Sequence, residues 1–140
     1  HANMLDTAVW RRFQTIIELP QPGLDEICRF LDQFPDVADD SGITESQWKS
    51  IYKAMDGFSY SDIKDIVQNM LKKTVLEKKT EIEIIDYLME TFLFKNHGNY
   101  SQEELVKYLS DNGAPQKMIA KALSVSDRTV RNYLGKGVSK

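Results

Sequence analysis

Apolar residues recur at helical spacing along most of this chain. In the first two thirds they return every three or four residues in four stretches, a spacing that places apolar side chains on one face of an α-helix. A strand-like run over residues 15–19 precedes these stretches and ends at Pro20. The pattern predicts an all-α chain with one strand near its start. The apolar faces are Leu24, Ile27, Cys28, Leu31 and Phe34; Trp48, Ile51, Tyr52 and Met55; Ile63, Ile66, Val67, Met70 and Leu71; and Ile84, Ile85, Leu88 and Phe92.

Polar residues mark where most of these helices are expected to begin. A hydroxyl residue followed three positions later by a Glu, Gln or Asp side chain is typical of a capping box, in which each residue bonds the other's backbone amide. Three such pairs occur at the required places, and Gly57 is expected to end the second helix. The pairs are Thr44 with Gln47, Ser59 with Asp62, and Thr80 with Glu83.

A polar stretch without periodicity, residues 95–98, is predicted to be a linker, and three shorter helices are expected after it. Ser101 with Glu104 would cap the first of them, which would end at Asn112 and Gly113. Pro115 suits the first turn of the second helix. Ser126 would cap the third, and Gly135 would close it.

Charge is distributed unevenly between the two parts of the chain. Residues 1–95 carry 11 Lys and Arg against 17 Asp and Glu, a balance of -6, whereas residues 96–140 carry 7 against 4, a balance of +3. A basic terminal part suggests contact with a polyanion. The length of 140 residues fits one medium domain or two small ones. One cysteine, Cys28, allows no internal disulfide, and we expect a cytoplasmic protein without a membrane partner.

Two ordered motifs are similar to segments of the AAA-type ATPases. Residues 5–13 read Leu-Asp-Thr-Ala-Val-Trp-Arg-Arg-Phe, and a strand-like run and Pro-Gln-Pro follow them. Residues 56–63 read Asp-Gly-Phe-Ser-Tyr-Ser-Asp-Ile, similar to the family's Gly-Phe-Ser-Gly-Ala-Asp-Ile. The first motif resembles the katanin and spastin branch. The resemblance implies a four-helix lid over residues 20–94, and the end of a truncated core over residues 5–19 that includes the residual strand.

The same resemblance implies roles in ATP chemistry. Arg11 and Arg12 would reach the ATP of a neighbouring subunit in a ring as arginine fingers, which stabilise the charge of the transferred phosphoryl group. The alternative is that they are solvated surface charge. Tyr60 and Ser61 would lie near the adenine and ribose, although the family has Gly and Ala at those positions. Phe30 and Leu31 would line the base, or belong to the lid core.

The sequence itself lacks the parts that hydrolysis requires. It contains no Gly-x-x-x-x-Gly-Lys-Ser/Thr loop and no acidic run after a hydrophobic strand to hold Mg²⁺. We therefore expect ATP with Mg²⁺ to bind the full-length protein, an ATPase, and expect no hydrolysis by this fragment. Residues 1–4 have no pattern and are interpreted as a vector remnant. His97 stands alone in the linker, so no metal site is expected.

Residues 116–134, within the terminal part over residues 99–140, resemble a DNA-binding helix-turn-helix. Ala120 is small where the two helices must cross closely, and Ser124 occupies the turn position where glycine is commonest. The buried wedge would comprise Ile119, Leu123, Val125, Val130 and Leu134. The candidate nucleic-acid contacts are Ser126, Arg128, Thr129, Arg131 and Asn132 on the recognition helix, with Lys117, Lys121 and Lys136 placed for phosphates.

Three functions are compatible with these features. The first is the C-terminal region of an AAA ATPase that acts on duplex DNA or on a DNA-bound complex. The second is a protein-interaction adaptor on a protein-remodelling ATPase, because three-helix units are reused as adaptors and Asp127 slightly disfavours DNA. The third is a transcriptional regulator without ATPase activity.

Overall fold

The computed structural model describes residues 21–33 and 42–136. Within these ranges the chain forms seven helices and no strand, so the all-α prediction is confirmed for this part. The predicted strand at residues 15–19, the arginine pair and Phe34 lie outside the described residues. The helices are α2 (Leu24–Leu31), α4 (Glu45–Ala54), α5 (Tyr60–Leu76), α6 (Ile84–Asn96), α7 (Gln102–Asp111), α8 (Gln116–Leu123) and α9 (Asp127–Lys136).

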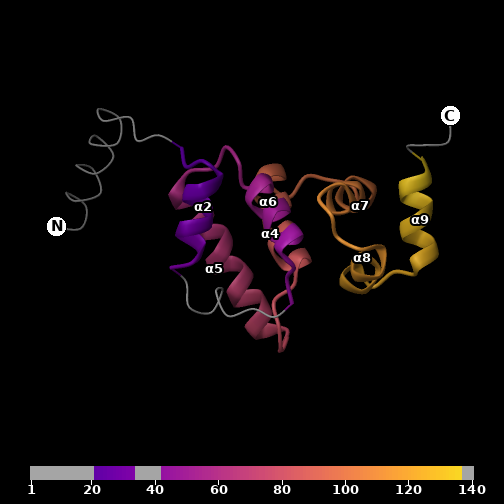
Figure 1. Cartoon of the computed structure of the whole chain (residues 1–140). Coiled ribbons are helices and arrows are strands. Elements are labelled where there is room, and N and C mark those ends of the chain that lie inside the picture. Colours follow the sequence, from indigo (N-terminus) through magenta and orange to yellow (C-terminus); the bar gives the residue numbers. More distant parts are fainter. Residues whose placement is uncertain (1–20, 34–41, 137–140) are drawn as a thin grey trace, which may run out of the picture.

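The helices form two groups, with α6 in contact with both. Figure 1 shows α2, α4, α5 and α6 together on one side, and α7, α8 and α9 on the other. We refer to the first group as the bundle and to the second as the terminal unit. Helix α6 packs against α4 and α5 in the bundle, and also against α7 and α8 in the terminal unit.

Two of the predicted capping boxes start helices of the bundle. The Oγ1 of Thr44 accepts from the Gln47 amide at 3.1 Å, and the Thr44 amide donates back to Gln47 Oε1. Ser59 and Asp62 make the same reciprocal pair at the start of α5, with both bonds at 3.1 Å. Each box satisfies two amides that have no partner within the helix. The predictions for these two helix starts are therefore confirmed.

The predicted start of the fourth helix was wrong. Helix α6 begins at Ile84 rather than directly after Thr80, and Glu83 is its N-cap residue. The Glu83 amide donates to Asp86 Oδ2 at 2.8 Å, so Asp86 is the third helical residue of the box, the position predicted for Glu83. The Lys79 ammonium then bonds the carboxylates of both Glu83 and Asp86. These contacts hold the helix start three residues later than predicted.

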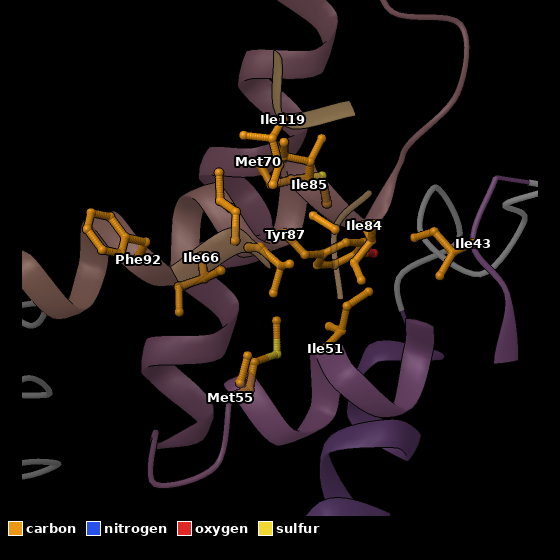
Figure 2. Close-up of a cluster of buried hydrophobic side chains, with 14 of the residues drawn as sticks. Ile43, Ile51, Met55, Ile66, Met70, Ile84, Ile85, Tyr87, Phe92 and Ile119 are labelled. Carbon is orange, nitrogen blue, oxygen red and sulfur yellow. The ribbon is translucent and has the colours of Figure 1, made fainter. Parts of the chain in front are cut away.

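The hydrophobic core is built around α6. Ile84, Tyr87 and Leu88 have no exposed surface, and Tyr87 meets Trp48 edge to face with ring centroids 5.4 Å apart. Figure 2 shows side chains of α4, α5 and α8 converging on this helix. The predicted apolar faces of α4, α5 and α6 all belong to this core or pack against it. On α2, however, Leu24 is 50% exposed, which corrects its predicted place on a buried face.

The terminal unit packs its three helices against one another in pairs. Ile119 and Val130 are fully buried, and Ala120 is 4% exposed, as expected for a close helix crossing. Leu123, Val125 and Leu134 pack against the same core from partly exposed positions. The predicted wedge is therefore confirmed as a set of contacts. Pro115 is the N-cap of α8 rather than a first-turn residue, and Gly135 lies inside α9 rather than ending it.

The junction between bundle and terminal unit is built from side chains. Helix α6 continues to Asn96, so the first two residues of the predicted linker are helical. Thr91 Oγ1 and the Tyr108 hydroxyl are 2.8 Å apart, which joins α6 to α7. Burial raises the pKa of Tyr108 above its usual value, and the hydrogen bond with Thr91 opposes that change. The Lys95 ammonium lies over the rings of Phe58 and Tyr108, 5.5 and 5.6 Å from their centroids.

Candidate nucleic-acid interface

Helix α8 presents two lysines on the side away from the core. Ile119 is fully buried, and Lys117 and Lys121 lie two residues before and after it. Since successive residues turn by about 100° around a helix axis, both lysines project from the face opposite Ile119. Both are exposed, and neither makes an ion pair with any described residue. Their ammonium groups are therefore accessible to an anion in solvent.

The turn between α8 and α9 depends on a left-handed residue. Ser124 has φ 55° and ψ 44°, and the next amide, that of Val125, donates to the Ala120 carbonyl at 3.0 Å. This bond closes the helix end in the manner of a Schellman motif. Glycine is common at such positions because it has no Cβ to clash in the left-handed region. The serine thus adopts the conformation that glycine would adopt without strain.

Replacing Ser124 with glycine should therefore stabilise the chain. We expect the free energy of unfolding to rise by about 1 kcal/mol, because the left-handed strain is removed. Thermal denaturation followed by circular dichroism would measure this change. Ala122→Gly, at an exposed position inside α8, is the matched control and should lower stability by about 1 kcal/mol. A lower melting temperature for Ser124→Gly would contradict the role assigned to this turn.

Helix α9 begins at a hydroxyl cap and presents polar side chains outward. Ser126 Oγ accepts from the Thr129 amide at 3.1 Å, which confirms the predicted cap. The hydroxyls of Ser126 and Thr129 also lie 2.9 Å apart and bond each other. These two residues therefore help to position the helix. Val130 is buried, Arg128 and Asn132 are exposed on the opposite side of α9, and Arg131 is exposed on the flank next to them.

The terminal unit separates its charges between helices. From residue 116 to residue 136, α8, α9 and their turn contain five Lys and Arg and one acidic residue, Asp127, a balance of +4. Helix α7 contains three acidic residues and one lysine, a balance of -2. One of its acidic residues, Glu103, pairs with Lys107 at 3.3 Å. The basic charge of the terminal unit therefore belongs to the two helices predicted to meet a polyanion. Lys136 ends α9.

The four residues proposed for nucleotide contact are divided between surface and core. Phe30 and Tyr60 meet edge to face with ring centroids 5.1 Å apart, and Tyr60 is 41% exposed. Ser61 is exposed beside them in the first turn of α5. Leu31 is 1% exposed and belongs to the core, so it has no surface to offer a ligand. Arg11 and Arg12 lie outside the described residues.

Sequence reasoning did not identify a charged cluster on the bundle. Lys73 pairs with Glu90 at 2.6 Å, and Lys79 pairs with Glu83 and Asp86 at 3.1 and 2.8 Å. Burial acts to lower the pKa of Lys79, but the hydrogen bonds and charges of the two carboxylates outweigh it, so the pKa is raised. Lys79 and Glu83 lie in the segment between α5 and α6, so their i to i+4 spacing is not helical and gave no signal for the pair. The Lys73–Glu90 pair joins two helices and has no local signal.

Comparison with family models, curated proteins and solved structures found no match to the chain. Within the described ranges, no group of three or more His, Cys, Asp or Glu residues is arranged to hold a metal ion. No helix of this part combines the length and the apolar character that crossing a membrane would require.

Proposed function

We propose that the chain binds duplex DNA through α8 and α9. The observation that carries the proposal is the placement of exposed basic residues on these two helices, opposite their buried faces. Lys117 and Lys121 are suited to phosphates, because ammonium groups act as point charges on the backbone. Arg128, Arg131 and Asn132 project from one face of α9, and arginine and asparagine can bond base edges in the major groove.

The resemblance of the bundle to an AAA lid supports a second proposal, which concerns the class of the full-length protein. Its capped α5 begins within the segment that resembles the AAA lid, and the described helices α2, α4, α5 and α6 agree in number with a four-helix lid. We propose that the chain is the C-terminal region of a ring-forming ATPase that acts on DNA or on a DNA-bound complex. ATP with Mg²⁺ would bind the core of that protein, with Arg11 and Arg12 acting on the neighbouring subunit's nucleotide.

Titration of a fluorescently labelled duplex tests the DNA proposal. The full chain should bind with modest affinity that falls as salt rises, since each phosphate neutralised by a lysine or arginine releases counterions. Arg128→Ala with Arg131→Ala should weaken binding at least tenfold, because loss of each base contact costs roughly 1–3 kcal/mol. Lys117→Ala should weaken binding to all duplexes alike and make the salt dependence shallower.

Arg29→Ala is the matched control, since Arg29 is an exposed arginine in the last turn of α2, outside the terminal unit. It should bind duplex as the unchanged chain does. Identical curves for the unchanged chain and the Arg128/Arg131 variant would overturn the assignment of α9. No salt-dependent binding at any concentration would favour the adaptor function instead.

A further inference from the structure

A cleft of about 450 Å³ opens where the bundle meets the terminal unit. Its walls are the C-terminal half of α5, the first half of α6, and Met118, Lys121 and Ala122 of α8. Small-molecule and side-chain pockets commonly occupy roughly 300–1,000 Å³, so the cleft is large enough for a ligand. It lies on the bundle side of Lys121, a residue that also belongs to the proposed DNA surface.

The cleft is lined on its apolar side by methionines. Met70 and Ile85 are 1% and 2% exposed, and Figure 2 shows them close to Ile119 of α8. Met89 and Met118 are partly buried and come from α6 and α8. Methionine has three rotatable bonds and a polarisable sulfur, so it adapts its shape to apolar partners of different sizes. An apolar side chain that enters the cleft can therefore contact adaptable methionine side chains on two walls, Met89 of α6 and Met118 of α8.

The wall formed by α5, α6 and the segment between them carries a net negative charge. It contributes two ammonium groups and four carboxylates to the cleft, a net charge of -2, and Lys121 on the α8 wall brings the whole lining to -1. Among the described residues Glu77 makes no ion pair, and it is exposed at the C-terminal end of α5. A carboxylate is disfavoured at a helix C-terminus, because the helix dipole is negative there. The lining charges on this wall are Lys73, Lys79, Glu77, Glu83, Asp86 and Glu90.

We propose that the cleft binds a short segment of a partner protein in which an apolar side chain lies beside an arginine or lysine. The apolar side chain packs on Met89 and Met118, and the cationic group pairs with Glu77. Charge complementarity favours a basic segment bound against the wall of α5 and α6, because the lining keeps a net charge of -1 with Lys121 included and the excess negative charge lies on that wall. This proposal does not depend on DNA binding and holds whether or not α9 contacts a duplex.

Methionine methyl resonances provide a direct test. In the full chain labelled with ¹³C at the methionine methyl groups, Met70, Met89 and Met118 report on the cleft, and buried Met55 reports on the fold. The probe is a blocked peptide, Gly-Leu-Arg-Leu-Gly, compared with the same peptide carrying Glu in place of Arg. We expect saturable shifts of the Met89 and Met118 signals with the arginine peptide, and binding of the glutamate peptide at least fivefold weaker.

Two variants of α5 identify the wall that holds the cation. Glu77→Lys should weaken binding of the arginine peptide about fivefold, since an attraction becomes a repulsion of up to about 1 kcal/mol at an exposed site. Asp65→Lys is the control, because Asp65 is exposed on the same helix but does not line the cleft. An unchanged Met55 signal shows that each variant is folded. Absence of shifts at millimolar peptide, equal binding of both peptides, or an unchanged affinity for Glu77→Lys would overturn the proposal.

Discussion

Replacing Ile119 with alanine is expected to lower the free energy of unfolding of the whole chain by about 2–5 kcal/mol. Ile119 is fully buried on α8, and its neighbours in the core include Met70 and Ile85 of the bundle (Figure 2). Removing three buried carbons costs their transfer free energy and leaves a cavity that the surroundings fill only in part. Because α6 packs on helices of both groups, the loss should reach the bundle as well as the terminal unit.

Denaturant unfolding measured by two probes tests this expectation. In a Trp10→Phe background, Trp48 fluorescence reports on the bundle, while far-ultraviolet circular dichroism reports on all helices. The fluorescence and circular dichroism transitions should coincide, and Ile119→Ala should shift both to lower denaturant concentration by the same amount. Met55→Ala, inside the bundle, is the control and should do the same. A Trp48 transition that stays in place while part of the helical signal melts earlier would show that the terminal unit unfolds separately.

Replacing Arg12 with alanine should lower kcat about 10³-fold in the ring ATPase proposed above, with nucleotide affinity nearly unchanged. The reason is that an arginine finger stabilises charge that develops on the transferred phosphoryl group in the neighbouring subunit's site. Binding of ATP in the ground state depends on the nucleotide-binding core, so its dissociation constant should change little. Arg11→Ala should have the same effect or weaken ring assembly.

Phosphate release under saturating ATP, with nucleotide binding measured separately, is the appropriate assay. Arg29→Ala, an exposed arginine on α2, is a control of the same chemistry and should retain normal turnover. The assignment fails if the Arg11/Arg12 double variant hydrolyses ATP at the normal rate, because the pair would then be surface charge alone.

The helix caps and the buried faces of single helices could be predicted from the sequence. Thr44, Ser59 and Ser126 each cap the helix predicted for them, because a capping hydroxyl bonds an amide only three residues away. The apolar spacing of α5 and α6 likewise predicted their buried faces, since helical periodicity alone determines which side chains share a face. The same helical periodicity predicted which basic residues of α8 and α9 are exposed.

Features that sequence spacing alone does not select required the tertiary structure, whether the residues involved are close or distant in the chain. The start of α6 at Ile84 depends on Asp86, which bonds both the Glu83 amide and the Lys79 ammonium. Glu83 and Asp86 could each have served as the third helical residue of a capping box. Only the folded segment shows that Asp86 does so. The contact of Thr91 with Tyr108 joins bundle and terminal unit, and no pattern in either helix indicates it.

What the sequence by itself determined is therefore the helical class and the residues that face outward from α8 and α9. Those properties follow from repeats of three or four residues and from interactions within one helical turn. The tertiary structure decided the exposure of Leu24, the pairing of Lys73 with Glu90 and the cleft beside α8. Each of these depends on how separate helices approach one another, and the packing of side chains from several helices decides that approach.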